Sequence, residues 1–330
     1  MTEDLAAVPG IVQTIEASGY DGFWTAETRH DPFLPHVLAA EHSKRLELGT
    51  GIAVAFARNP MNLAHIGWDL QANSGGRFIL GLGSQIKPHI RRRFSMEWSK
   101  PAARMREMIG AIRAIWASWN DGVPLRFRGE FYTHTLMTPF FDPGPNPHGD
   151  ARIFVAAVGP KMTSVTGEVA DGLLAHPFTT ESYLREVTIP TLAEGASLER
   201  RAAEDIELGL QVFVVTGTDD DDLAACAAEM RQQIAFYGST PSYRPVLAHH
   251  GWGDLQERLG TMSKRGEWEE MAGLIDDEIL ETFAVVGSPG EIGPEIKRRF
   301  GDVADRISLY PRPSGHSPEV THTIIEGLRQ

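Results

Sequence analysis

The chain has 330 residues and carries 31 Lys and Arg against 44 Asp and Glu, for a formal net charge of −13. This balance argues against non-specific binding to nucleic acid or to an anionic membrane surface, because both attract positive charge. No apolar run approaches the roughly 20 residues that span a bilayer, and no secretory signal is recognisable at the first residues. A single cysteine, Cys226, cannot form a disulfide within the chain and stands in an apolar helical pattern that predicts a buried thiol. We therefore expect a cytoplasmic, globular protein.

Apolar residues recur with alternating helical and extended periods along the chain. The first part predicts helices at 9–18, 35–44, 60–73 and 102–119, and extended segments at 22–27, 46–56 and 77–83. A segment rich in Pro and Gly follows, with a hairpin predicted around 128–130. The second part predicts strands at 152–158, 172–176, 207–216, 283–286 and 306–310, separated by helices. Strands separated by helices are typical of a parallel sheet.

The predicted fold class is α/β, as a closed (β/α)8 TIM barrel rather than an open doubly wound sheet. One domain would cover 1–330, with an insertion after strand four at about 122–149. The first strand is predicted to be short or missing, because the chain begins almost directly in the helix at 9–18. An open barrel would expose strand edges, so we expect an upstream segment, another part of the chain or another subunit to cover the gap.

In such a barrel the active site lies at the carboxyl ends of the strands. These ends carry mostly small and apolar residues and one carboxylate, that of Glu27. A glycosidase needs two carboxylates and a hard divalent cation needs several oxygen ligands, so both are disfavoured. No HExxH or CxxC spacing is present, and we expect no metal site. The surface instead suits a flat organic cofactor that supplies its own chemistry.

Two glycine-containing turns follow predicted strands at this end. The first comprises Gly159, Pro160, Lys161 and Met162 and opens a helix, so it predicts either an anion site at free N–H groups or an ordinary helix start. The second, Gly81-Leu82-Gly83, lacks the third glycine of a dinucleotide fingerprint. It predicts a close backbone approach to a ligand or a simple packing turn.

Several segments match one family in order, although each is weak alone. They are 19–27, 46–51 with 58–60, 74–84, 101–107 with 115–116, 127–132, and 156–162 with 169–172. Together they resemble the bacterial luciferase-like monooxygenase superfamily, and within it the oxidoreductases that use the deazaflavin coenzyme F420.

The resemblance implies a cofactor ring lying against a bulge of the third strand, with a cis peptide bond at Gly51-Ile52. It also implies a phosphate at the Gly159 turn. The cofactor-binding residues that it predicts are Gly51, Ile52, Ala53, Gly83, Ser84, Gly159, Pro160, Lys161 and Met162.

The sequence departs from the family pattern in two places. Relatives often carry a histidine directly after the acidic residue that ends strand two, whereas here Thr28 follows Glu27 and the histidine is His30. Relatives that oxidise sugar phosphates have a glutamate after strand four, where this chain has Ser84 and Gln85. The second departure argues against a sugar-phosphate dehydrogenase.

The expected function is hydride transfer between coenzyme F420 and an organic substrate held under the insertion. Glu27 or His30 would be the proton partner, because proton transfer needs a group within hydrogen-bond reach. An FMN-dependent monooxygenase of the same fold is the first alternative, and a non-redox ligand-binding barrel is the second. The expected partners are a small-molecule substrate and a second copy of the chain in a homodimer.

Overall fold

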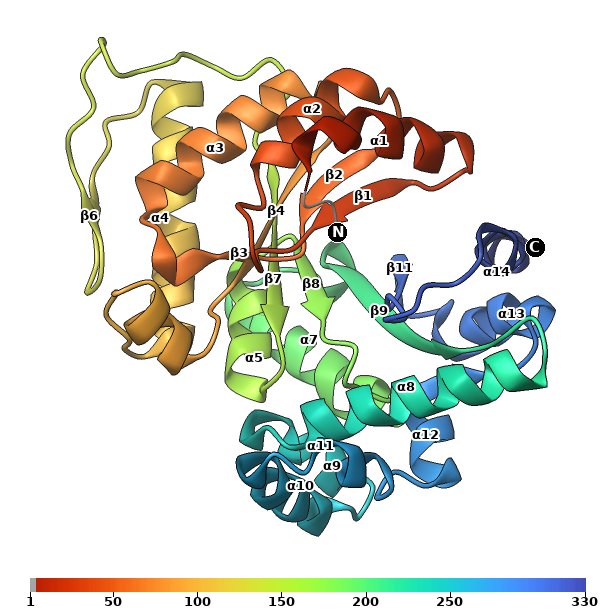
Figure 1. The fold of residues 1–330 in the computed structure, drawn as a ribbon. Coiled ribbons are helices and arrows are strands. Elements are labelled where there is room, and N and C mark those ends of the chain that lie inside the picture. Colours follow the sequence, from red (N-terminus) through yellow and green to blue (C-terminus); the bar gives the residue numbers. More distant parts are fainter. Residues whose placement is uncertain (1–3) are drawn as a thin grey trace. The chain divides into compact units, whose positions relative to one another are not determined.

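The computed structural model describes residues 4–330, and this chain divides into two compact units (Figure 1). Unit 1 contains the described residues up to Ala157, together with Ser164–Leu174 and Leu192–Ile206. Unit 2 contains Val158–Thr163, Ala175–Thr191 and Glu207–Gln330. None of the helices within residues 4–330 is long and apolar enough to cross a membrane.

The sheet of unit 1 is parallel. Its strands follow one another in the order β1 (Gly22–Thr25), β2 (Glu47–Thr50), β4 (Phe78–Gly83), β7 (Arg152–Ala157) and β8 (Gly172–Ala175). Every residue of β4 is buried, as expected for a central strand covered on both faces. The predicted α/β class is confirmed.

Helix α1 (Val8–Ala17) precedes β1, and α2 (Leu34–His42), α3 (Pro60–Asn73) and α4 (Pro101–Asp121) lie between the strands that follow. Helix α3 has the predicted bounds, because Pro60 occupies its first turn and the Asn59 side chain accepts a hydrogen bond from the N–H of Asn62. Helices α3 and α4 lie side by side (Figure 1), and the Trp116 indole donates to the carbonyl of Ala64 across them at 3.0 Å.

Within residues 4–330, no strand precedes α1. The extended segment predicted at 46–56 is wrong as a single strand. Strand β2 ends at Thr50, a short strand β3 (Ala53–Val54) pairs with the end of β4, and a 3₁₀ turn (Ala55–Ala57) follows.

The predicted insertion lies between α4 and β7. It contains an antiparallel hairpin of β5 (Phe127–Arg128) and β6 (Thr133–His134), as expected from the turn around 128–130. The Glu107 carboxylate on α4 accepts three N–H groups of the hairpin turn at 2.6–2.8 Å. The turn is thereby fixed to α4.

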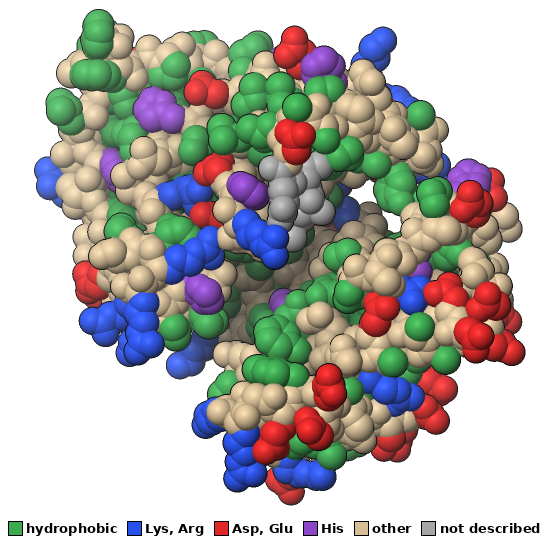
Figure 2. Space-filling model, viewed as in Figure 1, with side chains coloured by type: hydrophobic (Ala, Val, Ile, Leu, Met, Phe, Trp, Pro, Cys, Tyr) green, Lys and Arg blue, Asp and Glu red, His purple; other side chains and the backbone are tan. Residues whose placement is uncertain are grey.

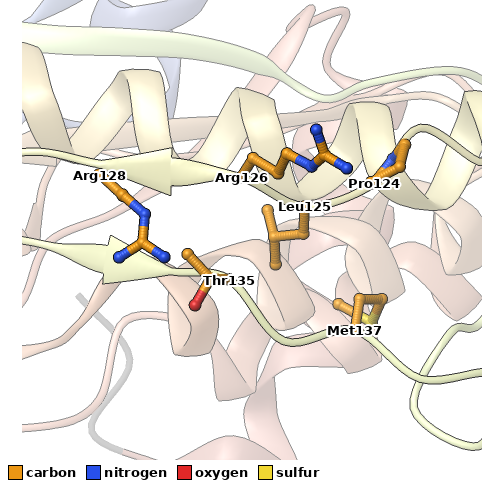
Figure 3. A pocket seen from close by; sticks show the side chains of 6 residues that line it. All are labelled: Pro124, Leu125, Arg126, Arg128, Thr135 and Met137. Atoms are coloured by element: carbon orange, nitrogen blue, oxygen red, sulfur yellow. The ribbon is translucent and has the colours of Figure 1, made fainter.

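A cavity of about 340 Å³ lies in the insertion (Figure 3). Its lining residues are Pro124, Leu125, Arg126, Arg128, Thr135 and Met137. None of these belongs to the residues predicted for the cofactor, so the cavity does not mark the predicted site.

Unit 2 is built on β9 (Glu207–Val215), which pairs in parallel with β11 (Arg306–Leu309) along its first half and with β10 (Ala284–Val286) at its end. Its helices are α6 (Glu181–Tyr183), α8 (Asp220–Gly238), α9 (Arg244–His249), α10 (Gly253–Arg265), α11 (Trp268–Ala272), α12 (Asp277–Phe283), α13 (Pro289–Phe300) and α14 (Pro318–Arg329). Helices α5 (Pro160–Val169) and α7 (Ile189–Leu198) contain residues of both units. Cys226 lies fully buried in the core of unit 2, which confirms the prediction of a buried thiol.

Candidate active site

The chain leaves the sheet of unit 1 at Gly51 and Ile52, between β2 and β3. The side chain of Thr50 bridges the gap, because its hydroxyl donates to the carbonyl of Gly81 at 2.7 Å and accepts the N–H of Gly81 at 2.9 Å. The peptide bond between Gly51 and Ile52 is cis, as the family resemblance predicts. These residues form a bulge, defined here as Gly51–Val54, at the carboxyl ends of β1, β2 and β4.

Glycines of β4 make room for this bulge. A Cβ atom on Gly81 would lie 1.7 Å from the carbonyl oxygen of Thr50, and one on Gly83 would lie 2.7 Å from Cδ1 of Ile52. Gly51 is exposed, and Ile52 and Ser84 are half-buried. Ala53 and Val54 are fully buried, so the bulge reaches solvent only through Gly51 and part of Ile52. The fold brings together five predicted cofactor residues of unit 1: Gly51, Ile52, Ala53, Gly83 and Ser84.

Glu27 holds the bulge from the end of β1. Its carboxylate accepts the N–H of Val54 at 2.7 Å and the guanidinium of Arg58 at 2.6 Å, and its own N–H donates to the carbonyl of Ile52 at 3.0 Å. The two charged side chains are 7% and 15% exposed, respectively. Arg58 also donates to the carbonyl of Val54 and pairs with Asp31 at 3.0 Å. We call Glu27, Arg58 and Asp31 the clamp.

The two predicted proton partners occupy different environments. Glu27 is committed to the clamp, where its carboxylate orients the bulge, while His30 is exposed in the loop that follows β1. Their assignment as proton partners stays a prediction.

The predicted anion turn belongs to unit 2. The carbonyl of Gly159 accepts the N–H groups of Met162 and Thr163, each at 3.1 Å, so the helix starts here as expected. Pro160 and Lys161 are exposed, and a Cβ on Gly159 would meet nothing within 4 Å. The turn thus has open space beside an exposed ammonium group and a helix N-terminus, which is the environment that an anion requires.

A second group of polar residues in unit 2 comprises His176 after β8, Tyr237 on α8, Tyr243 before α9 and Tyr310 after β11. His176 Nδ1 accepts the N–H of Phe178 at 3.0 Å, so its Nε2 carries the proton and donates to the hydroxyl of Tyr243 at 3.0 Å. The hydroxyls of Tyr237 and Tyr310 lie 3.1 Å apart. Burial lowers the pKa of His176 to about 4 and raises the pKa of Tyr243 and of Tyr310. These groups are therefore neutral near pH 7.

Other titratable residues serve the core or lack metal-site geometry. His36 is fully buried, its Nε2 lies 2.7 Å from the Thr25 hydroxyl, and burial lowers its pKa to about 4. In the part of the chain that the structure describes, no group of three or more His, Cys, Asp or Glu residues could hold a metal ion.

Sequence reasoning missed the clamp partners of Glu27 and the bridging role of Thr50. Arg58 stands in the matched segment 58–60, which was a usable signal for its importance but not for its contact with Glu27. Thr50 carries no local signal, because its role depends on Gly81 of a different strand.

The chain matches the luciferase-like monooxygenase family over residues 1–306, and it belongs to this family. It is 56% identical to an uncharacterised protein of Mycobacterium tuberculosis over 99% of this chain and 95% of the relative. It is 26% identical to the 5,10-methylenetetrahydromethanopterin reductase of Archaeoglobus fulgidus over 85% of this chain and 82% of the relative.

Among solved structures, the chain is similar to the coenzyme F420 dependent tetrahydromethanopterin reductase from Methanopyrus kandleri. The TM-score is 0.77, with 20% identity, and the match covers 98% of this chain and 94% of the other. This likeness confirms the predicted α/β fold. The predicted family resemblance is confirmed as well.

Proposed function

We propose that the protein is an oxidoreductase that transfers hydride between coenzyme F420 and an organic substrate. The observation that carries the proposal is the bulge, whose exposed Gly51 and half-buried Ile52 offer a surface for a planar ring beside Gly83 and Ser84. The deazaflavin ring would supply the hydride chemistry when bound. The similarity to F420-dependent reductases supports this cofactor, while the family's monooxygenase members keep FMN as the second candidate.

In this proposal the chain's own residues bind the cofactor and orient its ring. The bulge supports one face of the ring, and the clamp holds the bulge by hydrogen bonds to both sides of Val54. Lys161 and the helix N-terminus at its turn hold the cofactor phosphate. His30 or Glu27 exchanges a proton with the substrate.

Equilibrium binding of coenzyme F420 and of FMN, measured by fluorescence quenching, tests the cofactor. We expect saturable binding of F420 that is tighter than that of FMN. Binding of FMN alone would replace the proposal with a flavin monooxygenase, and binding of neither would favour the non-redox ligand-binding barrel.

The anion turn gives a sharper prediction. Replacing Lys161 by Glu should weaken cofactor binding by about 1.5–3 kcal/mol, because a charge-assisted contact to the phosphate is lost. Lys264 is an exposed lysine of helix α10, so Lys264→Glu is a control with the same charge change. The titration that measures cofactor affinity, run beside a thermal unfolding scan, checks both. Equal affinity in the Lys161→Glu variant and the wild type would refute the phosphate assignment.

A further inference from the structure

The segment between β4 and α4 concentrates positive charge on an acidic protein. Residues 85–100 contain five Lys or Arg and one acidic residue, whereas the whole chain has a net charge of −13. Figure 2 shows Lys and Arg side chains gathered at the left of the view, over the part where Figure 1 draws this segment. The segment therefore carries a local excess of positive charge, although the net charge of the chain is negative.

Three of these cations are exposed and unpaired. The members are Lys87, Arg91 and Arg92. Lys100 pairs with Glu130 at 2.6 Å, and Arg93 donates to the carbonyl of Thr28. Within residues 4–330, no carboxylate forms an ion pair with any of the three exposed side chains. Their charges are thus available to a ligand from solution.

The backbone that carries these cations is held firmly. A π-helical turn spans His89–Arg93, and Ile90 in it is fully buried. The N–H of Met96 donates to the carbonyl of Ile90 at 2.9 Å, and the ring of Trp98 packs edge-on against Phe56 at 5.9 Å. Phe56 lies two residues after the end of the bulge. The segment is therefore fixed beside the bulge instead of extending freely into solvent.

Its position in unit 1 connects it to the candidate site. The segment continues from Ser84 at the carboxyl end of β4, and Arg93 binds the backbone of Thr28 directly after Glu27. Carboxyl ends of parallel strands meet at one edge of the sheet, so the segment that carries these cations starts at the same edge as the bulge. Fixed charges around a site raise the local concentration of oppositely charged ligands.

We infer that Lys87, Arg91 and Arg92 form a capture surface for the phosphate or carboxylate groups of the small molecule that enters the site. The inference rests on the proposed function. It adds a surface that raises the rate at which the ligand associates with the protein. The net charge of the chain repels an anion at long range, and the capture surface reverses this repulsion locally. The surface attracts its ligand through solvent, so dissolved salt should weaken this attraction. The Debye length, beyond which charges are largely screened, is about 10 Å at 0.1 M ionic strength.

The test measures association rates by stopped-flow fluorescence with coenzyme F420, FMN and riboflavin as probes. FMN carries a phosphate and riboflavin carries none, while their rings are the same. Arg91→Gln/Arg92→Gln is the variant, and Lys264→Gln/Lys297→Gln is the control, since both remove two positive charges from exposed side chains. At low salt we expect the association rates of the variant with F420 and with FMN to fall by at least about threefold. Its rate with riboflavin, and the rates of the control variant, should stay the same. In 0.5 M NaCl, where charges are screened, the association rates of the variant and the wild type should agree to within about 20%.

Each outcome decides the matter. An effect on F420 and FMN assigns the surface to phosphate, and an effect on F420 alone assigns it to the carboxylates of that cofactor. The capture surface would be overturned by equal association rates in the variant and the wild type. It would also be overturned if riboflavin binding, or the control variant, were slowed to the same extent. Either result would leave the proposed function intact. Failure of the wild type to bind either cofactor would overturn the proposed function and the capture surface together.

Discussion

Replacing Gly81 by Ala is expected to destabilise the protein by at least about 3 kcal/mol, because the added methyl group has no space. Its Cβ would lie 1.7 Å from the carbonyl oxygen of Thr50 and 2.9 Å from the carbonyl carbon. Both neighbours are backbone atoms, so no side-chain rotation can relieve the overlap. Moving Thr50 would also break the two hydrogen bonds between its hydroxyl and the backbone of Gly81. The free energy of unfolding in urea measures the effect.

Gly10 supplies the matched control for this substitution. It lies exposed on helix α1, where a Cβ would meet nothing within 4 Å. Gly10→Ala should leave stability unchanged or raise it by roughly 0.5–1 kcal/mol, because alanine favours the helix. A Gly81→Ala variant as stable as Gly10→Ala would mean that the bulge can shift freely, which contradicts the geometry described above.

The second large effect is expected at the clamp. Arg58→Met should cost about 3–5 kcal/mol of stability, because it leaves the buried carboxylate of Glu27 without its counter-charge. Glu27→Gln should also destabilise, since it leaves the Arg58 guanidinium with a neutral partner. In the double variant no unpaired charge remains between these two positions. Its cost should therefore be clearly smaller than the sum of the two single costs, as urea unfolding of the four proteins would show.

A substitution of Asp31 distinguishes the contribution of the exposed contact of the clamp from that of the buried one. Its side chain is 41% exposed, so Asp31→Asn should cost less than about 1 kcal/mol. Strict additivity of Glu27→Gln and Arg58→Met, or an Asp31→Asn cost as large as that of Arg58→Met, would count against a clamp centred on Glu27.

The fold is most predictable where the signals are local. Helix α3 begins at Pro60 and has the bounds that the sequence predicts, and the structure adds a cap by the Asn59 side chain. Strand β4 is apolar along its length and lies fully buried in the centre of the sheet. Such signals act within one turn or one strand, so neighbouring residues suffice to define them.

Prediction fails where distant backbone contacts override the local pattern. Residues 46–56 have an unbroken extended pattern, yet the chain leaves the sheet at Gly51 because Thr50 bonds to Gly81 and Glu27 bonds to Ile52 and Val54. The π-helical turn at 89–93 follows no recognisable period. It depends on burial of Ile90 and on the packing of Trp98 against Phe56.

The sequence by itself indicated the parallel α/β class, the order of the elements and the family, and it predicted five cofactor residues that the structure brings together at the bulge. It could do so because periodicity, caps, small residues and ordered motifs are properties of short segments. Only the tertiary structure decided that the Glu27 carboxylate pairs with Arg58, and that three cations after β4 remain unpaired beside the site. Arg58 lies 31 residues from Glu27, and the pairing of a charge depends on which distant groups the packed strands bring within a few ångströms.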